Sequence, residues 1–186
     1  MKSAKMKAKD GRGFTLIELL IVVAIIGILS GILIPVFEGA MQKAKQKSTM
    51  VDIGNYAKAI TSYITDVGSA PTSPGGAADS GSTFFSQLIP FQYVTLPRRD
   101  QWGNPFRIWT GTDIAGHFGI DTSEVARDDF LIQSMGRDGV DEGYTYDRAS
   151  SENNFYVVQT MDDFNKDLIM WDGNWIRAPR AAEMRQ

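Results

Sequence analysis

Two hydrophobic patterns follow each other along the first third of the chain. Nineteen uncharged residues run from Leu19 to Phe37, and apolar residues then recur mostly every three or four positions as far as Val67. As a helix, the first run is roughly 28 Å long, close to the thickness of a bilayer's hydrocarbon core. The second spacing is typical of an amphipathic helix. Together they predict one helix from about Thr15 to about Asp66, whose first half spans a membrane and whose second half packs on a domain. The amphipathic positions are Val36, Phe37, Ala40, Met41, Ala44, Val51, Ala57, Ile60, Tyr63, Ile64 and Val67.

After the helix the pattern breaks into short segments. Residues 68–82 (GSAPTSPGGAADSGS) are rich in Gly, Pro, Ser and Ala, which indicates a loop. A short helical turn against the core is expected at 83–91 (TFFSQLIPF), followed by a strand at 91–96 (FQYVTL). The Gly-Asn-Pro sequence at 103–105 predicts a hairpin-like connection. Trp102 and Phe106, on either side of it, are expected in the core or at an interface.

Three further segments have strand character. They are residues 128–135 (DDFLIQSM), 154–161 (NFYVVQTM) and 168–177 (LIMWDGNWIR). In the last, Asp172-Gly173 lies between apolar runs, which is the strongest short-range hairpin signal. We therefore predict an α+β fold in which the long N-terminal helix covers one face of a small antiparallel sheet of three to five strands.

Charge and composition predict how the chain is oriented in the membrane. Residues 1–13 carry a net charge of +4, while the whole chain has −3 and a pI of about 5.2. By the positive-inside rule the basic head stays in the cytoplasm and the body is exported. The acidic balance argues against a nucleic-acid partner. Because the chain has no cysteine, disulfides and thiol chemistry are excluded.

Glu18 interrupts the start of the apolar segment. A charged side chain at a bilayer centre costs at least ~2.5–3.5 kcal/mol, so an intramembrane carboxylate indicates function. A cleaved signal peptide explains the segment poorly, because the apolar run is too long and lacks an A-x-A-like cleavage site. A plain membrane anchor fits the length but leaves Glu18 unexplained. Cleavage between Gly13 and Phe14 would create an amine on Phe14, which could pair with Glu18 of a neighbouring subunit.

The stretch GFTLIELLIVVAIIGILSGILIP (13–35) resembles the class III signal of bacterial type IV pilins and type II secretion pseudopilins. The resemblance implies cleavage after Gly13 by a prepilin peptidase and N-methylation of Phe14. It places Glu18 at the family's acidic position and Pro35 at its helix-weakening proline. Gly27 and Gly31 add a G-x-x-x-G spacing, which lets helices approach closely in lipid.

The resemblance also implies a domain organisation and a fold. Residues 1–13 would be a cytoplasmic leader that is removed, and 14–37 the transmembrane and polymerisation helix. Residues 38–67 would be the amphipathic helix, and 68–186 a periplasmic globular β domain, together a type IV pilin-like fold. The implied partners are other copies of the chain, the prepilin peptidase, minor pseudopilins and an inner-membrane assembly platform.

Two acidic clusters raise the question of a metal. Residues 134–143 (SMGRDGVDEG) and 160–169 (TMDDFNKDLI) are rich in oxygen ligands of the kind that calcium prefers, although neither has EF-hand spacing. The two segments resemble the halves of a calcium-binding loop in major pseudopilins, S-x-G-x-DG…D-x-x-DI-x-x-W, separated here by the insertion 140–159. On this resemblance we expect calcium at Asp138, Asp163 and Asp167, with Asp162 and Asn165 as alternates.

Enzymatic activity is not expected. The sequence has no P-loop, no G-x-S-x-G nucleophile motif and no H-E-x-x-H zinc motif. Its single histidine, His117, is expected to be structural.

The leading hypothesis is a major pseudopilin, for which the stretch DQWGNPF (100–106) and the acidic loop are the distinguishing resemblances. It predicts a single-pass inner-membrane protein that forms a periplasmic filament driving type II secretion. A type IV pilin of a surface fibre is the second hypothesis, although many such pilins close a C-terminal disulfide that this chain cannot form. The third is a membrane-anchored binding module that never polymerises.

Overall fold

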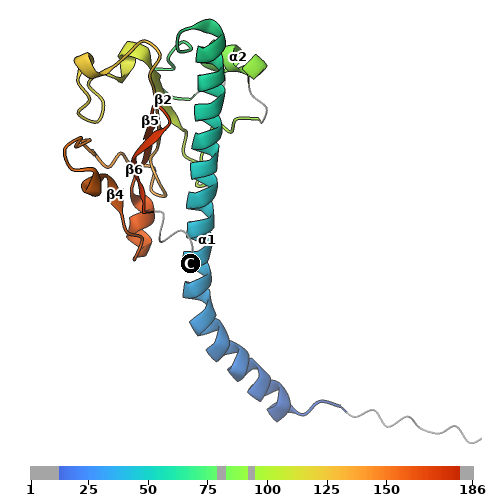
Figure 1. The fold of residues 1–186 in the computed structure, drawn as a ribbon. Coiled ribbons are helices and arrows are strands. Elements are labelled where there is room, and N and C mark those ends of the chain that lie inside the picture. The colour runs from blue at the N-terminus through green and yellow to red at the C-terminus, as the bar shows by residue number, and fades with distance from the viewer. Residues whose placement is uncertain (1–12, 79–82, 92–94, 181–186) are drawn as a thin grey trace, which may run out of the picture. The chain divides into compact units, whose positions relative to one another are not determined.

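The computed structural model describes residues 13–78, 83–91 and 95–180 (Figure 1). The chain divides into two compact units, Met1–Gly39 and Ala40–Gln186. Helix α1 (Leu16–Val67) contributes residues to both units and continues through Pro35. Its ends lie within one residue of the predicted Thr15 and Asp66, so the two hydrophobic patterns are confirmed as one helix.

Across the described residues, the second unit contains one six-stranded sheet in the order β1-β2-β3-β5-β6-β4. The strands are β1 (Gly76–Ala77), β2 (Arg107–Thr110), β3 (Phe130–Ser134), β4 (Phe155–Tyr156), β5 (Leu168–Trp171) and β6 (Asn174–Pro179). The short helix α2 (Thr83–Leu88) leads into the first of the five 3₁₀ helices that the described residues form. These are η1 (Ile89–Phe91), η2 (Gly111–Ile114), η3 (Thr122–Glu124), η4 (Ser151–Asn154) and η5 (Met161–Asn165).

The predicted Asp-Gly hairpin is confirmed in detail. Strands β5 and β6 pair in antiparallel register with Trp171 opposite Asn174, so the loop has two residues. Asp172 and Gly173 both have positive φ, 46° and 76°. These are the signs that a type I′ turn requires, and its twist matches that of the two strands.

One strand pairing contradicts the prediction of a purely antiparallel sheet. Strand β4 pairs with β6 in parallel, Phe155 opposite Ala178 and Tyr156 opposite Pro179. Strand β4 belongs to the insertion 140–159 and reaches β6 without a tight hairpin turn. Since only a short hairpin forces neighbouring strands to run in opposite directions, nothing local fixed the direction of this one.

Three segment predictions also need correction. At 91–96, Phe91 ends a 3₁₀ helix and Leu96 is irregular but buried, while 92–94 lie outside the described residues. At 154–161 only Phe155 and Tyr156 are extended. The 68–82 loop contributes the short edge strand β1, and 79–82 are again outside the described residues. The short helix at 83–91 and the strand within 128–135 are confirmed.

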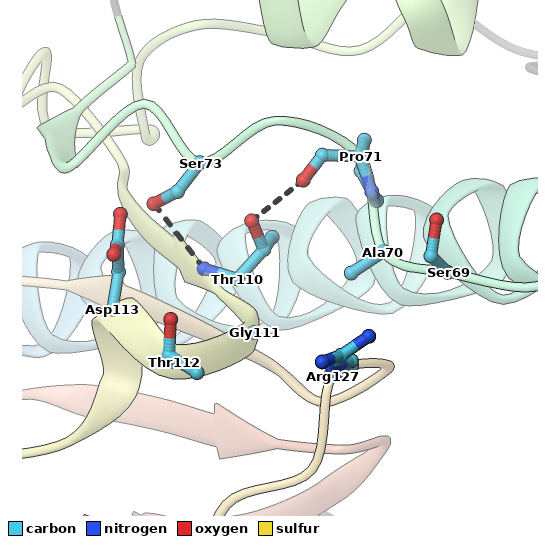
Figure 2. A pocket seen from close by; sticks show the side chains of 9 residues that line it. All are labelled: Ser69, Ala70, Pro71, Ser73, Thr110, Gly111, Thr112, Asp113 and Arg127. Atoms are coloured by element: carbon cyan, nitrogen blue, oxygen red, sulfur yellow. Dashed lines mark hydrogen bonds between the residues drawn. The ribbon is translucent and has the colours of Figure 1, made fainter.

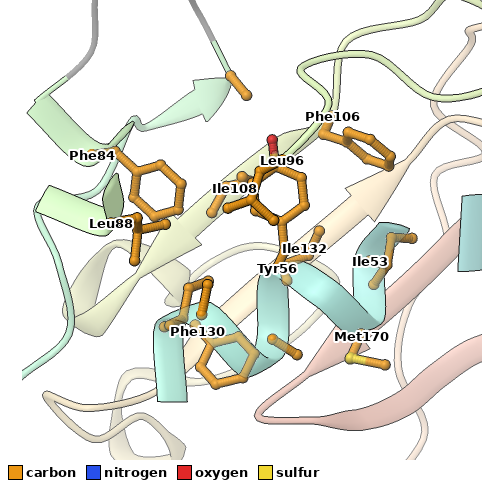
Figure 3. Packing of buried hydrophobic residues seen from close by; sticks show 14 of the residues in the cluster. Ile53, Tyr56, Phe84, Leu88, Leu96, Phe106, Ile108, Phe130, Ile132 and Met170 are labelled. Carbon is orange, nitrogen blue, oxygen red and sulfur yellow. The ribbon is translucent and has the colours of Figure 1, made fainter. Parts of the chain in front are cut away.

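The sheet buries both of its faces. In β3, Phe130 and Ile132 point into one hydrophobic cluster and Leu131 into the other, as the two-residue period of a strand requires. The first cluster packs against α1 and α2, with Tyr56, Phe84 and Phe106 close together (Figure 3). The second is covered by the irregular segments that contribute Ile114, Ile120, Phe118, Tyr144 and Tyr146. Both faces being covered explains why β5 is wholly apolar and why β3 begins with three apolar residues.

The buried face of α1 differs from the predicted stripe. Ala57 and Ile60 are buried as expected, but Val51 and Val67 are more than half exposed. Polar residues take part in the buried face because they are hydrogen-bonded: Gln46 donates to Tyr156, and the Thr49 hydroxyl accepts from the Gln101 amide. The buried residues are Gln46, Thr49, Ile53, Tyr56, Ala57, Ala59 and Ile60.

Candidate functional site

The expected processing and assembly residues lie at the start of α1. Gly13 and Phe14 precede the helix in irregular, exposed backbone, and Phe14 is 83% exposed. Thr15 is the last residue before the helix, and Glu18 lies in its first turn. The Gly13–Phe14 bond is therefore outside regular secondary structure, as a peptidase substrate needs to be.

Thr15 and Glu18 form a reciprocal cap that the sequence analysis missed. The Thr15 amide and hydroxyl both donate to Glu18 Oε2, at 2.9 and 2.8 Å. The Glu18 amide donates back to Thr15 Oγ1 at 3.3 Å. This is the capping box T-x-x-E, and the signal was present in the sequence just before the apolar run. Within a single chain the Glu18 carboxylate thus already has a partner.

The helix beyond this cap presents its apolar side chains to the outside. Every large hydrophobic residue from Phe14 to Phe37 is exposed, each by at least 46%. A Cβ atom added at Gly27 or Gly31 would meet no described atom within 4 Å. The helix is long and apolar enough to cross a membrane, with a mean hydropathy of 3.0 in its most apolar stretch. A single chain therefore leaves this surface for lipid or for other helices to cover.

In the second unit, the WGNP turn and the SMGRDG loop form one hydrogen-bonded structure around Asp100. Asp100 is only 5% exposed and accepts hydrogen bonds from the Ser134 hydroxyl (2.7 Å) and from the amides of Trp102 and Asn104. The Asn104 side chain donates to the Gly136 carbonyl at 2.7 Å. Burial raises the pKa of Asp100, and these hydrogen bonds oppose the rise. Only part of this arrangement is local: Trp102 and Asn104 lie two and four residues from Asp100, whereas its partner Ser134 lies 34 residues away.

The structure does not bring the three expected calcium ligands together. Asp138 is exposed and accepts from the Val140 amide of its own loop. Asp163 caps η5, accepting from Thr160, and pairs with Lys166 at 2.7 Å. Asp167 is fully buried and accepts from the Gln133 side chain and the Glu142 amide. Over the part of the chain that is described, no group of three His, Cys, Asp or Glu side chains is arranged to hold a metal ion.

Most acidic side chains of the two segments form ion pairs with arginine or lysine. The ion pairs are Arg107–Asp141, Arg137–Asp162, Lys166–Asp163 and Arg177–Glu142, and Arg137 also donates to the Asn165 side chain. A metal ion at these carboxylates would have to displace an arginine or lysine that neutralises them. The donor set in this structure therefore does not fit the expected calcium site, and calcium binding itself stays a prediction.

Asp167 is the unusual member of the group. Its Oδ1 atom is buried without a hydrogen-bond partner among the described residues. Burial raises its pKa to about 7, and the nearby Asp141 and Glu142 carboxylates act in the same direction, while hydrogen bonds from Gln133 and Glu142 oppose the shift. For Asp163, burial alone would raise the pKa, but the Lys166 and Thr160 hydrogen bonds hold the pKa below its usual range.

A shallow polar pocket of about 500 Å³ lies elsewhere in the second unit (Figure 2). The Thr110 hydroxyl donates to the Pro71 carbonyl at 2.7 Å and the Thr110 amide donates to Ser73 Oγ at 3.3 Å, which ties the 69–73 segment to β2. Asp113 and Arg127 also line it. His117, expected to be structural, stacks on Trp109 with ring centroids 4.4 Å apart. Neither place contains a recognisable catalytic arrangement.

Comparison with known proteins decides the family. The family model described as "Prokaryotic N-terminal methylation motif" matches residues 9–34. The type II secretion system core protein G of Aeromonas hydrophila is 31% identical over 140 residues, which cover 72% of this chain and 88% of that protein. The chain belongs to the core protein G family. The Klebsiella pneumoniae core protein G is 26% identical over 70% of this chain and 88% of its own length.

Fimbrial proteins match a smaller part. Fimbrial protein EcpB of Eikenella corrodens is 43% identical over 61 residues, a third of this chain and 38% of its own length. No solved structure matches the chain significantly. Membership of the core protein G family makes this chain a pseudopilin with an α+β, type IV pilin-like fold. The apolar helix and the family together indicate an inner-membrane anchor.

Proposed function

We propose that this chain is the structural subunit of a periplasmic pseudopilus that assembles through its N-terminal helix and drives protein secretion. The observation that carries the proposal is the apolar surface from Phe14 to Phe37. Its large hydrophobic side chains are each at least 46% exposed in one chain, and a single carboxylate, Glu18, lies near its start. In the membrane, lipid covers this surface. In a filament, the helices of neighbouring copies would cover the same surface. Helices can associate in lipid through van der Waals packing, without a hydrophobic driving force.

Processing prepares the carboxylate for assembly. A prepilin peptidase would cut the irregular Gly13–Phe14 bond, leaving an α-amine on Phe14 that is then methylated. Glu18 of an incoming subunit would neutralise the Phe14 amine of its neighbour. That pair gives register to a helix bundle that otherwise has only apolar contacts, because an unpaired charge inside the bundle would be costly. The Glu18 carboxylate would exchange its Thr15 hydrogen bonds for the new partner.

The processing step has its own test. The intact mass of the full protein purified from membranes should equal residues 14–186 plus one methyl group. A Gly13→Leu variant, which places a bulky residue at the cleavage position, should keep residues 1–13. An unprocessed mass for the native chain in a strain that contains the peptidase would contradict the proposal.

The central experiment is deletion of the gene, with secretion and surface pili assayed side by side. Loss of type II secretion with unchanged pili supports the pseudopilus. The converse result would identify a surface-fibre pilin, the second candidate, which the shorter fimbrial matches favour. Minor pseudopilins and an inner-membrane assembly platform are the proposed partners, and we propose no enzymatic activity for this chain.

A variant at Glu18 separates filament subunits from a membrane-anchored module that never polymerises. Glu18→Val removes the only charge between Phe14 and Phe37. It should abolish filaments and secretion while the protein still inserts into the membrane and its second unit stays folded. Normal secretion by Glu18→Val would favour the non-polymerising module.

A further inference from the structure

The side chain of Arg177 joins the insertion 140–159 to the sheet. From β6 its Nε atom donates to Glu142 Oε2 at 3.1 Å, and Nη2 donates to Glu142 Oε1. Its Nη1 atom donates to the Asn153 carbonyl at 3.2 Å. Glu142 lies near the start of the insertion, and Asn153 lies in its second half. One guanidinium therefore fastens two separate points of the insertion to β6, the strand next to the edge strand β4.

The surroundings of Arg177 stabilise a guanidinium that is largely desolvated. Its side chain is only 11% exposed. The guanidinium carbon lies 4.8 Å from the centre of the Tyr144 ring and 5.1 Å from that of Tyr156. Aromatic faces attract cations at this range, and the attraction grows when the cation is desolvated. Tyr144 lies in the first half of the insertion and Tyr156 in the second, so both ring contacts help to hold the insertion against β6.

The contact continues to the buried carboxylate of Asp167. The Glu142 amide donates to Asp167 Oδ2 at 3.2 Å, and the Asp167 amide donates back to Glu142 Oε2 at 3.3 Å. Arg177, Glu142 and Asp167 thus form a chain of hydrogen bonds from β6, through the insertion, to the start of β5. This connection lies between the two acidic segments that were expected to bind calcium.

We propose that Arg177 does the work expected of calcium: it neutralises the loop, fastens the insertion to the sheet, and makes the folded protein independent of the metal. Four observations carry this proposal. The three expected ligands do not converge, four acidic side chains of the two segments are paired with arginine or lysine, Arg177 is bidentate on Glu142, and it is enclosed by two tyrosines. A planar guanidinium suits this place because it binds a carboxylate with two parallel hydrogen bonds.

The test uses the full-length protein in detergent micelles, with and without calcium. Thermal unfolding is followed by tryptophan fluorescence, to which Trp171 and Trp175 of the β5–β6 hairpin contribute. The native protein should melt at the same temperature in millimolar calcium and in EGTA. A ligand that binds only the folded state raises the melting temperature by mass action, so a rise of several degrees in calcium would overturn the proposal.

Single and double variants test whether the Arg177–Glu142 ion pair stabilises the fold. Arg177→Gln should lower the melting temperature by about 5–10 °C, since it removes one partner of a mostly buried ion pair. Glu142→Gln should give a similar fall, and the double variant should fall by less than the sum of the two single changes, because both single changes remove the Arg177–Glu142 pair. Arg180→Gln is the matched control: the same change of charge, three residues further along, at an exposed position. It should shift the melting temperature by no more than a degree or two.

If Arg177→Gln does not fold, limited proteolysis of a milder variant tests the same contact. Arg177→Lys keeps the charge but loses the two-pronged contact, so limited proteolysis should cut it within 140–159 faster than the native protein. Equal cleavage rates for the native protein and Arg177→Lys would overturn the proposal. So would additive losses in the double variant, or a shift for Arg177→Gln no larger than that for Arg180→Gln.

Discussion

Thr15 and Glu18 satisfy each other's hydrogen bonds at the first turn of α1. The threonine amide and hydroxyl donate to one carboxylate oxygen at 2.9 and 2.8 Å, and the glutamate amide donates to the threonine hydroxyl at 3.3 Å. A carboxylate that is expensive in a membrane is therefore already partnered within its own chain. The proposed pairing with a neighbouring amine would then be an exchange of partners, and the cap would lower the cost of Glu18 in the bilayer before assembly.

Thr15→Val should loosen the start of the helix. The change removes the hydroxyl that both donates to Glu18 and accepts from its amide, and loss of such a cap costs about 1 kcal/mol. Amide hydrogen exchange in micelles should speed up at residues 16–19. Thr15→Ser keeps the hydroxyl and should exchange like the native protein. Unchanged exchange in Thr15→Val would show that the cap contributes nothing in a membrane-like environment.

Gly136→Ala should destabilise the second unit much more than Gly143→Ala. Both glycines have positive φ, 63° and 67°, so each alanine carries a backbone cost of roughly 1–2 kcal/mol. A Cβ at Gly136 would also lie 2.7 Å from the Asn165 carbonyl oxygen, whereas one at Gly143 meets no described atom within 4 Å. The added crowding brings the loss at Gly136 to about 2–5 kcal/mol. Urea unfolding of the two variants checks the difference, and equal losses would contradict it.

Tyr56→Phe should cost stability without disturbing the core. The Tyr56 ring is fully buried among Phe84, Phe85 and Phe106, and its hydroxyl donates to the Pro97 carbonyl at 2.6 Å. Phenylalanine keeps the ring contacts but leaves that carbonyl without its donor, at a cost of about 1–3 kcal/mol. The midpoint of urea unfolding should fall while near-UV circular dichroism stays native-like. A native midpoint would mean that the hydroxyl contributes nothing.

Stability should fall as pH rises from about 4 to 7, through Asp167. Burial raises its pKa from 3.8 to about 7 in the folded protein. In that window the folded state holds a proton that the unfolded chain has released, so raising the pH favours unfolding. The contribution is complete below pH 3.8 and lost above about pH 7. Asp167→Asn, which cannot titrate, should show a smaller fall in unfolding free energy between pH 5 and pH 7 than the native protein. Equal slopes would rule out Asp167 as the source.

Some elements of this fold are specified by signals that are local in the chain. The uncharged run and the three-and-four spacing gave α1 to within a residue, because a helix is specified by its own side chains. Asp172-Gly173 specified the β5–β6 hairpin, because the turn's positive φ values select those residues. The T-x-x-E spacing of Thr15 and Glu18 is an equally local signal for the cap.

Other features depend on contacts between residues far apart in the chain, and these emerge from the folded structure. It placed Gln46 and Thr49 in the packed face of α1 because their partners come from β4 and the WGNP turn. It made β4 parallel to β6 because no short turn fixed the strand's direction. It paired Glu142 with Arg177, 35 residues away, and so gave the acidic loop an internal cation. Spacing within a segment shows which side chains could bind a metal. Of the competing cations, Lys166 is local to Asp163, whereas Arg107, Arg137 and Arg177 reach Asp141, Asp162 and Glu142 only through the fold.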